Sequence, residues 1–254
     1  MSQIRFAEFA VFFDDGGVMN DNRIRGLQFQ KMVGDFFAPR FGGEPYKWAE
    51  SNVNFIEEIV KEHTEVISSG VNVDYRTYHE DFVKRWIEEM FNYVEVKLPA
   101  ISEYKRIYRE AIEYITPNIR SAYPGVIDSI KKLKKLGFKL YTASGEDSLE
   151  LKGYLQGMRI KNLFENFYGS DLVNTHKTNN NFFKRIFDDV WFEPDKAIII
   201  EDRPMFLECA LNSGANVIQA CLTGEYEPSY PHYVKNMTEL PKIVTDLVSN
   251  LKHK

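Results

Sequence analysis

A short apolar run that ends in two carboxylates and two glycines constrains the fold of this chain more than any other stretch. Positions 9–13 are apolar throughout, which is typical of a strand buried on both faces of a parallel sheet. The next four residues are acidic or glycine: Asp14, Asp15, Gly16 and Gly17. Open α/β folds bind ligands at the carboxyl edge of their strands, so we expect these carboxylates at a binding edge. Taken alone, the same residues also suit a tight turn.

The hundred residues after Asp21 show helical periodicity and no confident strand pattern. Asn22 is a suitable N-cap, and apolar residues recur at helical spacing in four stretches: 24–37, 48–67, 74–94 and 101–115. Residues 38–45 have the composition of a loop, with two prolines and a pair of glycines. We therefore predict an all-helical insert over residues 22–118.

Beyond residue 118, apolar strands alternate with helices. Strands are expected in four stretches: 138–145, 164–168, 197–200 and 217–220. This alternation favours a doubly wound parallel sheet of the Rossmann-like α/β type. We predict a core domain of residues 1–21 and 119–254, with the helical domain of residues 22–118 inserted above the carboxyl edge of the sheet as a lid.

The charge balance and the cysteine content exclude several classes of protein. The 254 residues carry a formal net charge of −5, which argues against a nucleic-acid partner. No apolar run approaches the ~18 residues that span a bilayer, and the first residues lack a secretory signal pattern. Two cysteines, Cys209 and Cys221, are too few for a disulfide framework. We expect a cytoplasmic protein without a nucleic-acid or membrane partner.

The chain resembles the haloacid dehalogenase-like (HAD) hydrolase superfamily at four short motifs, which occur in the family's order. The first motif of the family is a strand followed by Asp-x-Asp-Gly-Thr/Val; this chain has Asp14 at the nucleophile position and Gly16 in place of the second Asp. The later motifs contain a hydroxyl, a basic residue and an acidic pair, which here are Thr142, Lys177 and Glu201-Asp202. The helical insert resembles the C1-type cap of the family.

The resemblance implies a Mg²⁺-dependent phosphatase. Such an enzyme would hydrolyse a small phosphorylated molecule through an aspartyl-phosphate on Asp14, which splits one difficult displacement into two easier ones. The implied Mg²⁺ ligands are Asp14, the backbone carbonyl of Gly16 and Asp202. Glu201 would hold a metal-bound water.

The same resemblance implies that a cation and several hydrogen-bond donors hold the phosphoryl group. Lys177 would neutralise developing charge and keep Asp14 ionised. Thr142 would donate a hydrogen bond to a phosphoryl oxygen. Backbone amides after Asp14 and after Thr142 would complete the anion site: those of Asp15, Gly16 and Ala143.

Gly16 removes the group that the family uses as general acid and base, a contribution of ~10²- to 10⁴-fold to the rate. Asp15 is a poor substitute, because adjacent residues of an extended chain point to opposite sides. Four residues of the insert have side chains of a type that can take the role: Glu44, Tyr46, His79 and Glu80. Without a replacement, we expect a preference for aryl and acyl phosphates, whose oxygen leaves easily as an anion.

Other functions are also compatible with Gly16. Relatives that lack the second Asp include haloacid dehalogenases, which need no metal; the Glu201-Asp202 pair argues against that activity. They also include phosphonatases, which use a cap lysine as a Schiff base, and nothing distinguishes one of the insert's lysines, Lys31, Lys47 and Lys61. A third alternative is a non-catalytic protein that binds a phosphorylated ligand.

The sequence identifies neither the substrate nor the oligomeric state. The aromatic residues of the insert suit a core better than a ligand pocket: Phe36, Phe37, Phe41, Tyr46 and Trp48.

Overall fold

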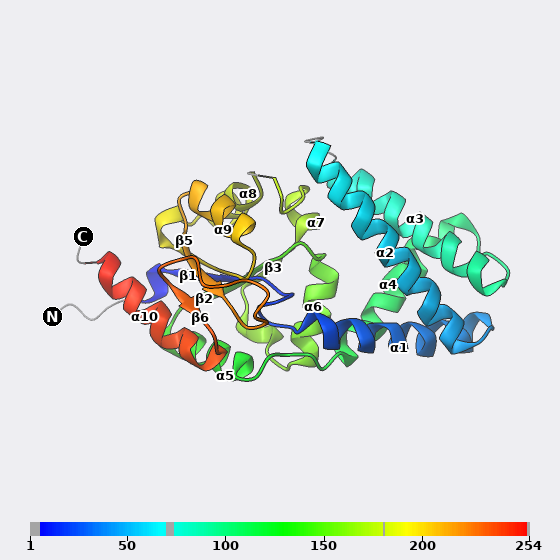
Figure 1. The fold of residues 1–254 in the computed structure, drawn as a ribbon, viewed down its shortest axis with the longest axis horizontal. Helices are drawn as coiled ribbons and strands as arrows, with labels where there is room; N and C mark the ends of the chain where they lie inside the picture. The colour runs from blue at the N-terminus through cyan, green and yellow to red at the C-terminus, as the bar shows by residue number, and fades with distance from the viewer. Residues whose placement is uncertain (1–5, 70–73, 180, 253–254) are drawn as a thin grey trace.

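The fold is described by a computed structural model over residues 6–69, 74–179 and 181–252, with the backbone alone at 63–69. In these residues, six strands form one sheet with parallel pairings throughout, in the order β3-β2-β1-β4-β5-β6 (Figure 1). The strands are β1 Ala10–Phe13, β2 Lys139–Ala143, β3 Asn166–Tyr168, β4 Ala197–Glu201, β5 Asn216–Ala220 and β6 Tyr233–Val234. Because β1 lies between β2 and β4, the order of the strands reverses at β1, which is where open sheets bind ligands.

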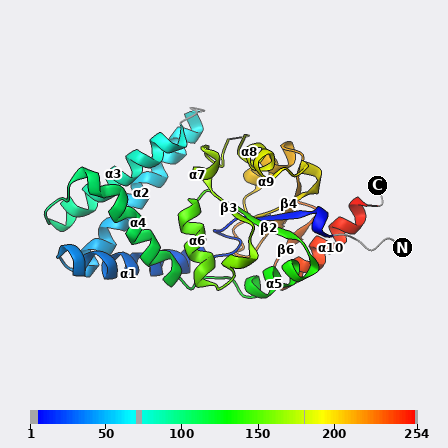
Figure 2. The same cartoon turned by 180° about the vertical axis from the view of Figure 1, so that it is seen from behind.

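Helices cover both faces of this sheet (Figure 2). Alternate side chains of β1 point to opposite faces, with Val11 and Phe13 in one apolar cluster and Ala10 and Phe12 in another. The helices of this part are α5 Val126–Leu136, α6 Ser148–Gly157, α7 Ser170–Val173, α8 Asn181–Val190, α9 Pro204–Asn212 and α10 Leu240–Leu251. Helices α5 and α10 pack in the first cluster, and α8 and α9 pack in the second. The predicted doubly wound parallel α/β fold is thus confirmed.

Between β1 and β2 the described chain forms a block of long helices that extends away from the sheet (Figure 1). The helices are α1 Asn22–Phe41, α2 Pro45–Ser69, α3 Tyr75–Val94 and α4 Tyr104–Ile115. Their apolar faces meet in a separate aromatic cluster, in which Trp48 stacks on Phe37 with ring centroids 4.9 Å apart. The Trp86 indole donates to Asn52 Oδ1 at 2.9 Å, which satisfies its buried N–H. Phe36, Phe37 and Trp48 are buried in this core, whereas Tyr46 is exposed.

Local details differ from the sequence expectation. The N-cap of α1 is Asp21, whose carboxylate accepts from the backbone of Arg23 and Ile24, so Asn22 is already helical. The expected loop at 38–45 is shorter, because α1 continues through Pro39 to Phe41. Its C-cap Gly42 adopts φ 83° and donates its amide to the carbonyl of Ala38. A proline in the last turn removes one helical N–H, a small loss at a helix end. The strand β6 was not expected, since two residues carry no periodic pattern.

Two further expectations were that the chain has no membrane-spanning helix and no secretory signal. None of the described helices is both long enough and apolar enough to cross a bilayer. The expected lack of a secretory signal concerns the first residues, and residues 1–5 lie outside the described ranges.

Candidate active site

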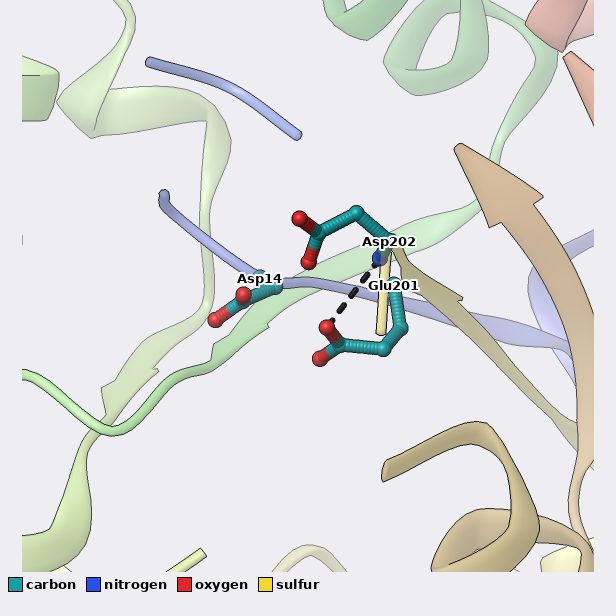
Figure 3. A group of neighbouring side chains, drawn as sticks. All are labelled: Asp14, Glu201 and Asp202. Atoms are coloured by element: carbon teal, nitrogen blue, oxygen red, sulfur yellow. Dashed lines mark hydrogen bonds between the residues drawn. The ribbon is translucent and has the colours of Figure 1, made fainter. Parts of the chain in front are cut away.

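Three carboxylates meet where β1 and β4 end. The two strands are paired in register, with Phe13 opposite Ile200, so Asp14 and the Glu201-Asp202 pair leave the sheet side by side. Carboxylate oxygens of these three residues all lie within 4.8 Å of one another (Figure 3). All three residues are buried, which concentrates negative charge in a region of low polarity.

A buried lysine partly neutralises this group. Lys177, in the segment that follows α7, places Nζ 2.8 Å from Asp14 Oδ1 and also contacts Glu201 Oε2. Burial disfavours the charged lysine, but the two carboxylates prevail and hold the pKa of Lys177 above its ordinary value. Burial and the nearby Glu201 nevertheless raise the pKa of Asp14 to about 6, despite Lys177. One lysine therefore does not balance three carboxylates.

The oxygens of Glu201 and Asp202 are used differently. Glu201 Oε1 accepts from the backbone amides of Asp202 at 3.1 Å and Arg203 at 3.0 Å, the first of which is drawn in Figure 3. Because Oε2 contacts Lys177, both oxygens of Glu201 have protein donors. Asp202 Oδ1 is buried and, among the described residues, has no hydrogen-bond partner. A buried carboxylate oxygen without a donor fits a bound cation, and a set of carboxylate oxygens suits a hard ion such as Mg²⁺.

The two glycines after Asp15 bring the backbone close to this group. Gly17 adopts φ 82°, and a Cβ there would lie 2.2 Å from Asp202 Oδ2. The turn is closed by the Gly17 amide, which donates to the carbonyl of Asn20 at 2.9 Å. Gly16 lines the same cavity as Asp14. Glycine at position 17 is therefore needed both for the backbone conformation and for the space that Asp202 fills.

Thr142 and Ala143 are the last two residues of β2, with Thr142 opposite Phe13 of β1. Thr142 lies inside β2 and is fully buried, and its hydroxyl donates to the carbonyl of Tyr168 at 3.2 Å. Ala143 is the last residue of β2 and is paired with Tyr168 in the sheet. The first hydroxyl beyond the strand belongs to Ser144, which donates to Glu146 Oε2 at 2.6 Å. Without a ligand the Thr142 hydroxyl is directed at the Tyr168 carbonyl, and its donation to a phosphoryl group stays a prediction.

No motif in the sequence points to Arg25, which lies beside Gly16. Its Nη1 is 2.5 Å from Asp15 Oδ2 and 2.7 Å from Glu146 Oε1. Burial alone would raise the pKa of Glu146, but Arg25 and the Ser144 hydroxyl lower it to about 2. The Asp15 side chain is thus turned toward Arg25 and, through a 2.7 Å hydrogen bond, toward Asn20.

A cavity of about 410 Å³ opens above the carboxylates, between the sheet edge and helices α2 and α3. Asp14, Gly16, Arg25 and Lys177 line it on the sheet side. The helices of the insert contribute mainly apolar and aromatic residues: Ile56, Ile59, Val60, Tyr75, Tyr78, His79, Phe82 and Tyr108. Charged residues also line the cavity, namely Glu146, Asp147, Glu150 and Arg203. The helical insert therefore covers the carboxylates with residues other than the aromatic ones expected in its core.

Among the four residues expected as replacements for the missing acid, one lines this cavity. It is His79, whose Nε2 lies 2.7 Å from Asp147 Oδ2; burial opposes its charged form, but Asp147 prevails and raises the pKa of His79. Glu44, Tyr46 and Glu80 are absent from the described lining, and Glu80 instead lies 2.7 Å from Lys105. The same holds for the three lysines considered for a Schiff base, Lys31, Lys47 and Lys61.

Comparison with known proteins agrees with this arrangement. Residues 53–220 match the family model described as haloacid dehalogenase-like hydrolase. No significant match is found among curated proteins. The putative HAD-hydrolase YfnB from Bacillus subtilis, solved with magnesium, is similar in fold, with TM-score 0.61, 15% identity, and 93% of this chain and 98% of that chain covered.

Two further structures share the fold with similar TM-scores and sequence identities. A HAD phosphatase from Thermococcus onnurineus has TM-score 0.61 and 20% identity, and covers 93% of this chain and 97% of its own. The L-2-haloacid dehalogenase from Xanthobacter autotrophicus has TM-score 0.56 and 14% identity. The match covers 93% of this chain and 98% of that chain. At these identities the likeness concerns the fold, while the family model covers most of the chain. The expected resemblance is confirmed: this protein belongs to the haloacid dehalogenase-like hydrolase family.

Proposed function

We propose that this hydrolase is a Mg²⁺-dependent phosphatase that acts on a small phosphorylated molecule through an aspartyl-phosphate on Asp14. The observation that carries the proposal is the contact of 2.8 Å between Lys177 and Asp14, beside a buried Asp202 oxygen that lacks a donor. A nucleophile held by a lysine next to a cation-accepting carboxylate suits phosphoryl transfer, in which charge on phosphoryl oxygens must be neutralised. The phosphatase and magnesium-bound relatives support this choice.

Each residue of the site has a proposed part in the reaction. Asp14 attacks phosphorus and is regenerated when water hydrolyses the aspartyl-phosphate. Lys177 keeps Asp14 ionised and offsets charge on the transferred group. Thr142 stays the proposed donor to a phosphoryl oxygen, together with the backbone amides of Asp15, Gly16 and Ala143.

The proposed metal site consists of Asp14, the carbonyl of Gly16 and Asp202. A bound Mg²⁺ would offset the negative charge that the carboxylates and the phosphoryl group share. Glu201 has protein donors on both oxygens, so we assign it to the positioning of Lys177 and of the Asp202 backbone. We also propose that residues 22–118 act as a cap domain over the core of residues 1–21 and 119–254.

Phosphate release in the presence and absence of Mg²⁺ tests the function. We expect release of inorganic phosphate from a panel of phosphate esters with Mg²⁺ and none after chelation by EDTA. Halide release from 2-chloropropionate without metal, in a protein that hydrolyses no phosphate ester, would instead indicate a dehalogenase. Phosphate binding without turnover of any panel member would indicate a non-catalytic protein.

Substitution of the two acidic residues at the end of β4 should separate their roles. We expect Asp202→Asn to weaken Mg²⁺ binding by at least ~100-fold, because it removes a proposed ligand. Glu201→Gln should mainly lower kcat, because its amide can still accept from the backbone but no longer carries charge toward Lys177. Calorimetric titration with Mg²⁺ measures the affinities directly. Equal loss of affinity in the two variants would contradict the assignment.

Gly17→Ala should disturb the metal site through Asp202. The added methyl group would occupy the place of Asp202 Oδ2, so we expect a ~10- to 100-fold loss of Mg²⁺ affinity. Gly224→Ala is the matched control, because Gly224 has φ 73° and open space around its Cβ position. Both variants should lose about 1–2 kcal/mol of stability from the left-handed backbone, measured by denaturant unfolding. An unchanged Mg²⁺ affinity in Gly17→Ala would disprove the role of this contact.

A further inference from the structure

The space beside Gly16 is filled by the side chains of Asn22 and Arg25. A Cβ at Gly16 would lie 2.4 Å from Asn22 Oδ1 and 3.2 Å from Arg25 Nη2. Both side chains therefore occupy the volume that a longer residue at position 16 would need. A guanidinium stays charged at any pH a protein tolerates, so Arg25 can stabilise an anion but cannot release a proton to it.

Arg25 is held in place from two sides. Its Nη1 contacts Asp15 and Glu146, while Nη2 is the nitrogen next to Gly16. Glu146 also accepts from Ser144, and Asp15 also accepts from Asn20 at 2.7 Å. The Arg25 side chain is 18% exposed. Such a network fixes the guanidinium before any ligand arrives, which is how donors for developing charge are most effective.

The leaving oxygen of a bound ester would lie in the cavity that Arg25 lines. In phosphoryl transfer the attacking and leaving oxygens are roughly in line, so the leaving oxygen points away from Asp14 into the cavity. Lys177 is bound to the attacking side, through its contact with Asp14. Arg25 lines the cavity and contacts neither Asp14 nor Glu201 among the described ion pairs.

One part of the cavity wall is formed by aromatic rings. His176 meets Tyr75 and Tyr78 edge to face, with ring centroids 5.0 Å and 4.9 Å apart. Tyr75 is fixed by its hydroxyl, which donates to Asp147 at 2.6 Å. A flat ring carried by the leaving oxygen would pack on this wall, because aromatic rings favour offset and edge contacts.

We propose that Arg25 binds the leaving oxygen and that the substrates are aryl phosphates, the phosphate esters of acidic, ring-borne hydroxyl groups. The inference rests on the proposed phosphatase function. Asp14 forms the new P–O bond while the P–O bond to the ring breaks, and the electron pair leaves on a phenolate that Arg25 stabilises without proton transfer. Water then attacks phosphorus, the bond to Asp14 breaks, and the proton of water passes to the released phosphate.

The test is the dependence of kcat/KM on the leaving group. The probes are 4-nitrophenyl, phenyl and 4-methoxyphenyl phosphate, with glycerol 3-phosphate as the alkyl ester. For the wild type we expect kcat/KM to fall steeply as the leaving hydroxyl becomes less acidic. Arg25→Gln should lower kcat/KM for phenyl phosphate by ~10²- to 10³-fold, and for 4-nitrophenyl phosphate by less than ~10-fold.

Two further variants show whether a loss of activity comes from the missing charge at Arg25 or from a disturbed fold. Arg25→Lys retains a positive charge beside Asp15 and Glu146 and should recover part of the loss on phenyl phosphate. Arg23→Gln is the matched control, because Arg23 lies two residues away with a side chain 80% exposed, and it should match the wild type.

Several results would overturn the role of Arg25 while leaving the phosphatase intact. These are a kcat/KM independent of the leaving group, an equal loss in Arg25→Gln on every substrate, or a leaving-group dependence that appears only in His79→Asn. The last of these results would indicate that His79 donates a proton to the leaving oxygen. Absence of phosphate release from all four probes, with no covalent phosphoenzyme, would count against the proposed function itself.

Discussion

Asp14→Asn is expected to abolish phosphate release, with a loss of ~10⁴-fold or more, because an amide cannot act as the nucleophile. The fold should persist, since Asn has the same shape and Lys177 keeps its contact with Glu201. Phosphate release under saturating Mg²⁺ measures the loss, and thermal unfolding checks the fold.

Asp21→Asn is the matched control for this exchange. Asp21 is also a buried aspartate close to β1, but it caps α1, a role that Asn performs equally well. Its activity should equal that of the wild type. A folded Asp14→Asn protein with the activity of the Asp21→Asn control would rule out the covalent mechanism.

Gly16→Asp combined with Asn22→Gly is expected to speed the second half of the reaction. Removal of the Asn22 side chain clears the atom that would lie 2.4 Å from the new Cβ, and Gly16 is not among the residues with positive φ. The new carboxylate would lie beside Arg25, which holds it ionised, so it would act as a base for water more than as an acid. We expect kcat on 4-nitrophenyl phosphate to rise by ~10- to 100-fold, with a smaller gain on glycerol 3-phosphate.

Pre-steady-state kinetics shows which step has changed. Without a base near the aspartyl-phosphate, the wild type should release a burst of 4-nitrophenol and then turn over slowly. The double variant should lose the burst, and Asn22→Gly alone should retain it. A larger gain on glycerol 3-phosphate than on 4-nitrophenyl phosphate would mean that residue 16 acts mainly as an acid, contrary to this expectation.

The parts of the site that lie at strand ends could be predicted from the sequence. The apolar run of β1 and that of β4 each end at carboxylates, and parallel strands in register bring those ends together. The helical periodicity of the insert was equally clear, because four amphipathic stretches contain no strand pattern. Such local patterns depend only on which side chains each element buries.

The parts that depend on where a strand ends, or on contacts between distant segments, could not be predicted. The chain offers two hydroxyls near the end of β2, and only the extent of the strand shows that Thr142 faces Tyr168 while Ser144 lies beyond it. Arg25 meets Glu146 because α1 packs beside the segment that precedes α6, and no sequence pattern encodes that contact.

The most direct test of the covalent route is the mass of the protein after acid quenching of the reaction with 4-nitrophenyl phosphate and Mg²⁺. Slow hydrolysis of the aspartyl-phosphate predicts that wild-type protein gains the mass of one phosphoryl group and that peptide mapping locates it on Asp14. Asp14→Asn protein should show no gain. Phosphate release without any adduct, or an adduct on another residue, would contradict the mechanism.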